Sequence, residues 1–566
     1  MNSAPSTYVR AASRWIRGRA PEPGSTRTEL VAGIPGAISS VPDGMASSVL
    51  TGVNPVHGLY ASIFGPVAGG LTSSTRLMVI TTTSASALAA GSAIKGFDPG
   101  DRERVLFLLT VMAGALMVVA GLLQLGRYTR FVPHSVMIGF LSGVAANIVF
   151  GQLPDFFGAE ASGPYPLAKA WDLLTHPSRI DLATTACGVT ALVLLLVLSR
   201  TKLGVYAALI ALVVPSVVVG IWGSGDIELV SDVGEIPSGL PTPALPHLSD
   251  LTLGVIAGAF AIAVLVLIQG AGVSEAAPNP DNSRSDPNQN FVAQGVGNVV
   301  SGLFRGQPVG GSVGQTAVNV SAGAVGRWAA IFSGLWLAVI LVAFSEIVGD
   351  VVMATLAAVL IVAAVGSFRT NQIMAIMRTG RNSQVAVITT FLATLFLPVA
   401  AAVGVGIALA LMMQINQEAL DLRVVELVPD GDGRFVEQPA PAQLDSRRVV
   451  LLDIYGSLYY AGAKTLQAHL PDPSRAEGPA VVIRLRGRAL LGSTSYAVLS
   501  DYAQRLDAVG GRLYLSGVDP ATHRQMTRNR TVEQAGDVHI FETSPTIGES
   551  SLQAYRAAEE WLAGPA

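Results

Sequence analysis

Charged side chains are scarce in this chain, and the few that occur are unevenly distributed. Only 13% of the 566 residues are Asp, Glu, Lys or Arg, whereas soluble domains usually carry about 25%. Residues 30–420 hold few of them, and residues 421–566 hold many. This asymmetry argues against a single soluble domain and predicts a membrane domain followed by a soluble one.

Several kinds of chemistry lack the residues that they require. The seven histidines show no metal-ligand spacing and no nucleophile–base arrangement is recognisable, so neither a metal site nor enzyme activity is expected. Gln315 stands where a phosphate-binding loop at residues 306–314 would need a lysine. The single cysteine, Cys187, excludes an intrachain disulfide. The net charge of −3 argues against a nucleic-acid partner, and no cofactor is expected.

Long apolar segments occupy most of residues 29–420, and about fourteen of them approach the roughly 20 residues needed to cross a bilayer. The clear ones lie near residues 105–125, 131–152, 182–199, 203–222, 251–273, 329–348 and 350–366. Weaker or glycine-interrupted ones lie near residues 29–50, 58–74, 77–94, 290–304, 308–322, 384–397 and 399–416.

Basic residues between these segments indicate the orientation of the chain. With an even number of spans and a cytoplasmic N-terminus, most loop Lys and Arg residues, including Arg76, Arg369 and Arg378, fall on the cytoplasmic side. The positive-inside rule therefore favours a multi-pass protein of the inner (plasma) membrane with both termini in the cytoplasm. Residues 1–28 are basic and contain no apolar core, so they are predicted to be a cytoplasmic segment rather than a cleavable signal peptide.

Four of the weak or glycine-containing spans form two pairs that are seven spans apart. The third span begins with Thr81-Thr82-Thr83-Ser84, and the tenth contains Gly310-Gly311-Ser312-Val313-Gly314-Gln315. The first and eighth are interrupted by Pro or Gly at residues 41–45 and 269–275. Interrupted segments at matching positions predict a transporter built from inverted repeats, with its site near mid-membrane. Half-helices at these breaks would direct N–H groups and positive dipole ends toward an anion.

Residues 446–566 alternate between strand and helix patterns, which predicts a small α/β domain. Strands are expected at residues 448–455, 481–485 and 512–516, and amphipathic helices at 494–508, 519–529 and 550–563. Residues 421–445 are rich in Pro and Gly and are expected to be a linker. The predicted domains are therefore a transport domain at 29–420, this linker, and a cytoplasmic domain at 446–566.

Several of these stretches resemble one family. Residues 41–46 (Val-Pro-Asp-Gly-Met-Ala) and 55–60 (Pro-Val-His-Gly-Leu-Tyr) resemble the first-span signature of the SulP anion permeases, and residues 294–304 and 308–319 resemble their ninth and tenth spans. Residues 491–495 resemble a turn of the STAS domain. The resemblance implies fourteen spans in a seven-plus-seven inverted repeat with core and gate domains. It also implies a homodimer and a small anion substrate such as sulfate, bicarbonate, chloride or a dicarboxylate.

Two positions depart from this family. Gln269 stands where many relatives have an acid in the eighth span, and Gln315 stands where many have an arginine in the tenth. Loss of both charges together is physically coherent, because removing one partner of a buried pair would strand the other. The missing acid makes sodium the less favoured coupling ion.

Asp43 is the most informative single residue, because an aspartate within an apolar span is costly and is by default a functional candidate. We hypothesise that Asp43 binds a proton and that its protonation lets an anion share the cavity. The alternative is that Asp43 caps backbone groups freed around Pro42 and Gly44.

The predicted substrate-binding residues gather at the interrupted spans. Ser and Thr would supply hydroxyl donors, the tenth-span break would supply backbone N–H groups, and the two glutamines would be neutral hydrogen-bonding partners. The full set is Asp43, Gly44, Met45, Thr81, Thr82, Thr83, Ser84, Gln269, Gly311, Ser312, Val313 and Gln315. The alternative for Ser and Thr is ordinary packing against neighbouring backbone.

The predicted function is secondary active transport of a small inorganic or carboxylate anion by alternating access, with a proton as the expected coupling ion. Alternatives are a nucleobase–proton symporter of the same fold and a non-transporting sensor that signals through the STAS domain. That domain is a candidate for binding a cytoplasmic partner. Ser493 and Thr494 are candidates for regulatory phosphorylation, although simple capping of the following helix is favoured.

Overall fold

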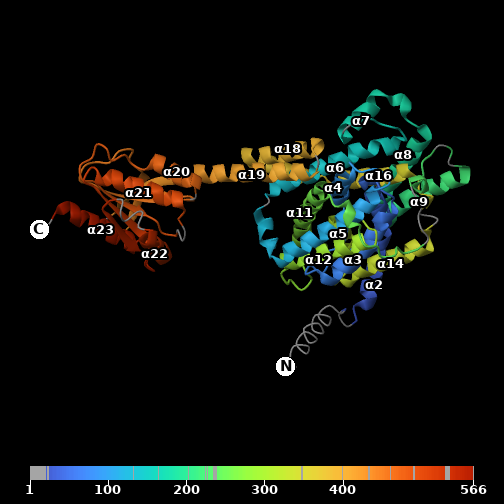
Figure 1. Ribbon diagram of the computed structural model, residues 1–566, viewed down its shortest axis with the longest axis horizontal. Coiled ribbons are helices and arrows are strands. Elements are labelled where there is room, and N and C mark those ends of the chain that lie inside the picture. The colour runs from blue at the N-terminus through green and yellow to red at the C-terminus, as the bar shows by residue number, and fades with distance from the viewer. Residues whose placement is uncertain are drawn as a thin grey trace. The chain divides into compact units, whose positions relative to one another are not determined.

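The computed structural model forms two compact units, Met1–Ala410 and Leu411–Ala566 (Figure 1). Most of the predicted N-terminal segment, residues 1–28, lies outside the part of the chain that the structure describes. The described residues are 21, 24–131, 133–163, 165–201, 203–223, 225, 227–233, 239–345, 349–397, 399–430, 434–458, 460–487, 491–529 and 536–564.

Each of the fourteen predicted spans coincides with one helix or with a short strand followed by a half-helix. In chain order these are α2 (Thr26–Thr51), α3 (Val56–Thr72), β1 (Ile80–Thr82) with α4 (Ser84–Ile94), α5 (Arg102–Leu122), α6 (His134–Phe157), α8 (Leu182–Leu198), α9 (Ala207–Trp222), α11 (Leu253–Ala276), α12 (Pro287–Leu303), β2 (Val309–Gly311) with α13 (Val313–Ser321), α14 (Trp328–Ala343), α16 (Met353–Ser367), α18 (Arg381–Phe396) and α19 (Val399–Leu420).

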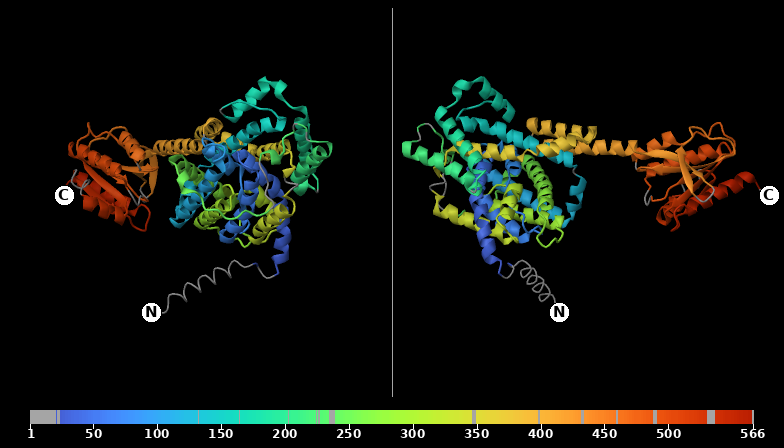
Figure 2. Two further views of the ribbon diagram at one scale, coloured as in Figure 1. Left: turned by 45° about the vertical axis from the view of Figure 1, so that its right-hand side comes forward. Right: turned by 180° about the vertical axis from the view of Figure 1, so that it is seen from behind.

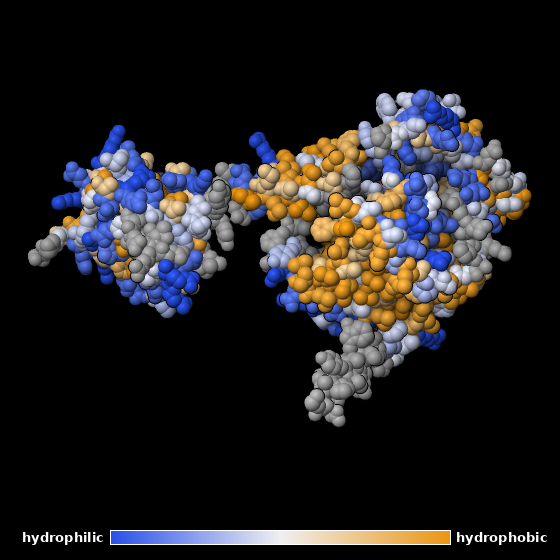
Figure 3. Space-filling model, viewed as in Figure 1, coloured by the Kyte–Doolittle hydropathy of each residue, from blue (hydrophilic) through white to orange (hydrophobic). Residues whose placement is uncertain are grey.

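The surface of the helical unit is apolar over wide areas, as expected for lipid contact. Four stretches of the described residues are by themselves long and apolar enough to cross a membrane: Arg102–Leu122, His134–Phe157, Leu253–Glu275 and Met353–Met377. Hydrophobic residues dominate the visible face of this unit in Figure 3, whereas the second unit is mostly hydrophilic on that face. The fold is a polytopic helical membrane domain followed by an α/β domain.

The helices of the first unit pack as two groups. Figure 2 shows these helices in two further views. In the core group, α12 packs against α5 and α3, and α14 packs against α2 and α3. In the gate group, α6 packs against α16 and α18, and α8 packs against α9 and α16. The groups meet mainly where α2 contacts α16 and α9, and where α4 contacts α6. Corresponding spans of the two halves therefore lie in the same group, as an inverted repeat requires.

Two of the four expected interruptions are absent. Only the third and tenth spans are broken, at β1 and β2, whereas α2 and α11 are continuous helices through residues 41–45 and 269–275. Pro42 stays within α2 because a proline removes one helical hydrogen bond and bends a helix without having to end it. Asp43 therefore does not cap a break in its helix.

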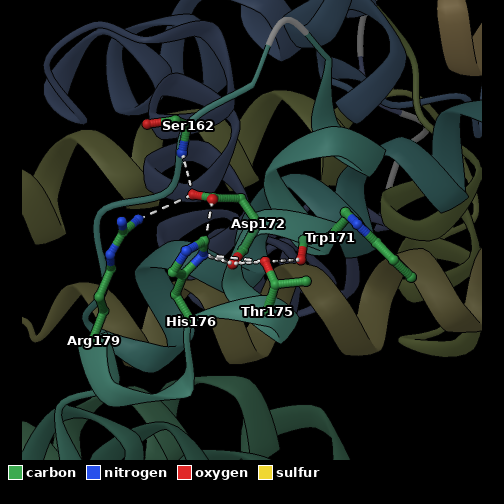
Figure 4. Close-up of polar contacts among 6 residues, drawn as sticks. All are labelled: Ser162, Trp171, Asp172, Thr175, His176 and Arg179. Atoms are coloured by element: carbon green, nitrogen blue, oxygen red, sulfur yellow. Dashed lines mark hydrogen bonds and ion pairs between the residues drawn. The ribbon is translucent and has the colours of Figure 1, made fainter.

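The hairpin between the fifth and sixth spans is held by one carboxylate (Figure 4). Asp172, on α7 (Pro166–Thr175), accepts a hydrogen bond from the Ser162 N–H at 2.9 Å and pairs with Arg179 at 3.2 Å and His176 at 3.1 Å. The Ser162 N–H, and after it Arg179 and His176, hold the pKa of Asp172 below its ordinary value. This contribution to stability is complete above about pH 4 and is lost as the pH falls further.

The second unit is a six-stranded sheet with strand order β4-β3-β5-β6-β7-β8. Its strands are β3 (Arg423–Pro429), β4 (Phe435–Pro439), β5 (Val449–Tyr455), β6 (Ala480–Arg484), β7 (Arg512–Val518) and β8 (Val538–Glu542), and β5 to β8 pair in parallel. The helices are α20 (Tyr460–His469), α21 (Ser493–Asp507), α22 (Pro520–Asn529) and α23 (Glu549–Ala563). All three predicted strands and all three predicted helices are present.

Residues 421–445, which the sequence suggested to be a linker, instead contribute β3 and β4 to this sheet. Val425 pairs with Asp453 of β5 on one side and with Pro439 of β4 on the other. The run Val424–Val428 is short and contains Glu426, and the neighbouring Pro and Gly residues obscured its strand character.

The crossing of α2 and α3 depends on two glycines. A Cβ at Gly58 would lie 1.8 Å from the Gly44 carbonyl oxygen, and a Cβ at Gly44 would lie 3.0 Å from the Gly58 carbonyl oxygen. At Gly58 there is no space for a side chain, because the obstacle is backbone of the partner helix, and at Gly44 a side chain would fit only if that backbone moved slightly. Gly44 therefore sets how closely α2 approaches α3 and how Asp43 is presented.

We predict that Gly58→Ala lowers the free energy of unfolding by about 3 kcal/mol, at the upper end of the range for overpacking. Gly96→Ala is the matched control, since nothing lies within 4 Å of a Cβ there. Thermal unfolding of the purified protein in detergent measures both. Equal thermal midpoints for the two variants would show that α2 and α3 can move apart without loss of stability, which would contradict the prediction.

Candidate functional site

The two unwound stretches of the core group pair with each other. β1 and β2 are antiparallel, with Ile80 opposite Gly311, Thr81 opposite Gly310 and Thr82 opposite Val309. The ladder continues beyond the strands, because the Ser312 N–H donates to the Val79 carbonyl at 2.9 Å. In a membrane interior unpaired backbone groups cost several kcal/mol each, and this pairing satisfies them. This pairing therefore joins the third and tenth spans at their breaks.

Two amides of α12 satisfy the outer edge of β2. The Asn298 side chain donates to the Val309 carbonyl at 2.7 Å and accepts from the Val309 N–H at 2.9 Å. The Gln294 carbonyl oxygen accepts from the Gly311 N–H at 3.2 Å. Asn298 thus reproduces the hydrogen bonds of a neighbouring strand. Sequence reasoning missed both residues. Two amide side chains within one membrane span could have indicated them, because buried amides need hydrogen-bond partners.

Each strand leads directly into a half-helix that starts with a side-chain cap. Thr83 accepts a hydrogen bond from the Ser86 N–H at 3.2 Å before α4, and Ser312 accepts one from the Gln315 N–H at 3.3 Å before α13. Each cap satisfies one of the free N–H groups of its helix, and the others remain available at the first turn. The positive dipole ends of α4 and α13 both lie at the same cavity, since Ser84 and Val313 line it.

Asp43 accepts a hydrogen bond from a neutral side chain, which is itself bonded to another residue of the same helix as Asp43. Ser39 donates to the Gln315 carbonyl oxygen at 3.0 Å, and the Gln315 amide nitrogen donates to the Asp43 carboxyl group at 2.6 Å. The Ser39 bond fixes the orientation of the amide, so that its N–H₂ end faces Asp43. Gln315 therefore connects the first and tenth spans through Asp43 without a fixed positive charge.

A cavity of about 420 Å³ lies between the core and gate groups. Its core wall is formed by Asp43, Ser47, Thr82, Thr83, Ser84, Ala85, Gln269, Ser312, Val313 and Gly314. Its gate wall is formed by α6 and α16 and by one cation beyond α16, with lining residues Leu141, Val144, Ala145, Ile148, Val359, Leu360, Ala363, Gly366, Ser367 and Arg369. The wall that carries hydrogen-bonding groups thus faces a wall that is mostly apolar.

The predicted substrate-binding residues divide into those that line the cavity and those that support it. Seven line it: Asp43, Thr82, Thr83, Ser84, Gln269, Ser312 and Val313. Gln269 also accepts a hydrogen bond from Thr83 at 3.4 Å. The other five, Gly44, Met45, Thr81, Gly311 and Gln315, lie behind this surface. Met45 is fully buried in the core, and Thr81 donates to Ser62 at 3.2 Å.

The gate wall was not predicted, because its lining residues are ordinary apolar side chains that carry no chemical signal. Its elements could nevertheless have been found from the repeat. The cavity is lined by the first, third and fifth spans and by the eighth, tenth and twelfth, which are three pairs seven spans apart. Arg369, which the loop charges place on the cytoplasmic side, lines the cavity wall in the structure.

In the second unit, Ser493 is exposed and begins α21, and Thr494 follows it half-buried. Ser495 is buried and donates to the Leu458 carbonyl at 2.5 Å, so its hydroxyl is occupied. The residue at the N-cap position is Gly492, which has no side chain, so the expected capping of this helix by Ser493 or Thr494 is wrong. Phosphorylation at Ser493 or Thr494 stays a prediction.

The sulfate permease family matches residues 27–400, and the STAS domain matches residues 442–550. The chain is 25% identical over 482 residues to the bicarbonate transporter BicA of Synechocystis, covering 84% of this chain and 83% of BicA. It is 23% identical over 542 residues to sulfate transporter 4.1 of Arabidopsis thaliana, covering 91% of this chain and 78% of that protein.

Solved structures show the same fold. The structure of SLC26A9 superposes with a TM-score of 0.82 at 16% identity, covering 98% of this chain and 95% of that one. The transmembrane domain of a cyanobacterial bicarbonate transporter BicA superposes with a TM-score of 0.60 at 21% identity, covering 69% of this chain and 98% of that one.

We predict that Asn298→Leu destabilises the protein, because it leaves the Val309 N–H and C=O groups buried and unpaired. Each unpaired group costs roughly 1–3 kcal/mol. The thermal midpoint in detergent should fall, and the variant should also lose substrate binding and transport. Asn416→Leu, at an exposed position on α19, is the matched control. An Asn298→Leu protein as stable as this control would contradict the edge-strand role.

Proposed function

This chain belongs to the sulfate permease family, and we propose that it is a secondary active transporter of a small inorganic or carboxylate anion. The observation that carries the proposal is the pair of half-helices, α4 and α13, whose N-terminal turns line one cavity. Free N–H groups and positive dipole ends favour an anion there without a buried cation. The relatives named as bicarbonate and sulfate transporters support the same substrate class.

We further propose that Asp43 couples transport to protons. A carboxylate on the core wall repels an anion in the same cavity, and protonation of Asp43 removes that repulsion. Among the residues that line the cavity, from α2, α4, α6, α11, α13 and α16, the other ionisable side chain is Arg369. His134 lines a small cavity next to it. Anion uptake should therefore increase when the pH on the side of entry falls.

Sodium is the less favoured coupling ion. Gln269 lines the cavity beside Thr83, with which it forms a hydrogen bond. An amide side chain brings no negative charge to balance a bound cation, and the Thr83 hydroxyl donates to Ser86 at 2.9 Å and, over a longer distance, toward Gln269 at 3.4 Å. A site arranged in this way favours neutral hydrogen bonding over cation binding.

Alternating access follows from the two walls of the cavity. The core group carries the hydrogen-bonding residues, and the gate group contributes a mostly apolar wall from α6 and α16. Movement of one group against the other, in an elevator-like or rocking manner, would carry the anion across the membrane. We place the protein in the inner (plasma) membrane as a homodimer with cytoplasmic termini, and assign the STAS domain to interactions with a cytoplasmic partner. No observation favours nucleobase transport or a sensor without transport.

We predict that Asp43→Asn abolishes the proton-driven component of anion uptake. Proteoliposomes would be loaded at neutral pH and supplied with labelled bicarbonate, sulfate or a dicarboxylate, with and without an inward proton gradient. The wild type should accumulate one of these anions faster under the gradient. The Asn variant, which is neutral at every pH, should show no acceleration by the gradient.

Asp98→Asn is the matched control, because Asp98 is an exposed carboxylate outside the cavity, and it should behave as the wild type. Gradient-stimulated uptake that survives in Asp43→Asn would remove the proton role and leave anion transport standing. Absence of uptake of any anion by the wild type would overturn the transport proposal itself.

A further inference from the structure

Arg369 is the cationic side chain of the cavity, and it comes from the gate side. It follows α16 and precedes the first residue of α17 (Thr370–Met377). The side chain is half-buried and lines both the main cavity and the neighbouring cavity of about 70 Å³, which is also lined by His134 and Gln269. It therefore stands where these two spaces meet.

The guanidinium group of Arg369 has no carboxylate partner among the described residues. Its side chain donates to the Gln372 carbonyl oxygen at 3.4 Å, which is a long hydrogen bond, and the described ion pairs do not include it. An arginine fork has five N–H donors, so most of its hydrogen-bonding capacity faces the cavity or solvent. A half-buried cation without an acidic partner is suited to an anionic ligand.

Charge balance across the cavity limits what that ligand can be. The lining carries one acidic side chain, Asp43, and one fixed cation, Arg369, together with the partial positive ends of α4 and α13. A singly charged anion beside protonated Asp43 is balanced by Arg369. A doubly charged anion exceeds the formal charge of Arg369 by one, so only the partial positive ends of α4 and α13 offset its second charge, and an ionised Asp43 adds to that excess.

We infer that Arg369 is the gate-side counter-charge of the transported anion and that it restricts the site to singly charged anions, such as bicarbonate, chloride or a monocarboxylate. This inference rests on the proposed anion transport and specifies its substrate class. Arg369 contacts the anion from the wall opposite Asp43, Ser84 and Val313. The core wall supplies directional N–H and hydroxyl donors, and the gate wall supplies the charge.

The test compares uptake of labelled bicarbonate, chloride and formate with uptake of labelled sulfate in proteoliposomes of four proteins: wild type, Arg369→Gln, Arg369→Lys and Arg378→Gln. Arg378 follows α17, is exposed and lines neither cavity, so Arg378→Gln is the matched control for loss of a nearby charge. Thermal midpoints of all four proteins would establish that they are folded.

The wild type should transport a singly charged anion and show little uptake of sulfate. Arg369→Gln should raise the KM for that anion by about tenfold or more, equivalent to about 1.4 kcal/mol. Arg369→Lys should restore most of the affinity, since it keeps the charge, and Arg378→Gln should match the wild type.

Wild-type sulfate uptake with a KM as low as that for the best singly charged anion would overturn the charge restriction. An unchanged KM in a folded Arg369→Gln protein, with normal wild-type uptake, would overturn the role of Arg369 and leave the proposed function intact. Wild-type protein that takes up none of the anions would overturn the proposed function and this inference together.

Discussion

The site depends on the antiparallel pairing of β1 with β2. Both strands lie in the interior of a membrane domain, where unpaired backbone groups are costly, and each satisfies the other across the ladder from Ile80–Gly311 to Thr82–Val309. Asn298 and Gln294 complete the hydrogen bonds at the outer edge. Because the strands are fixed, α4 and α13 must start where the strands end. The two helix N-termini then lie at one cavity with their free N–H groups.

The same arrangement explains why the site needs so little charge. Two helix N-termini provide partial positive charge that requires no counter-ion and no buried cation. Gln315 holds Asp43 through a neutral amide, so the core wall carries a single ionisable group. Arg369 on the opposite wall is the proposed counter-charge of the anion. In the proposed mechanism, protonation of Asp43 and binding of one singly charged anion leave no excess formal charge in the cavity, which lowers the cost of moving the anion through a membrane.

Much of this fold follows from patterns that the sequence displays directly. The length of the apolar segments predicts membrane spans, and the strand–helix alternation after residue 446 predicts an α/β domain. Each predicted span has its counterpart in the structure. The breaks at residues 81–84 and 310–315 were recognisable because hydroxyl residues or glycines cluster there within otherwise apolar spans. Pro42 was less informative, because a proline within a long helix can bend it without ending it, and α2 is continuous.

The rest of the site depends on contacts between distant segments. Thr81 belongs to a broken span, but alternation along β1 puts it on the face opposite to that of Thr82, which lines the cavity. The bond between Gln315 and Asp43 joins residues 272 positions apart. Leu141 and Val359 are ordinary apolar residues that become cavity lining only when the gate helices pack against the core.

The most direct test of the account is the number of protons that enter with each anion. Wild-type proteoliposomes containing a pH-sensitive dye would be given a labelled anion without an imposed pH gradient, and the change in internal pH would be measured together with the uptake. The account predicts that one proton enters with each anion. The internal pH should therefore be lower than it would be if the anion entered alone. Anion uptake without any accompanying proton would contradict it.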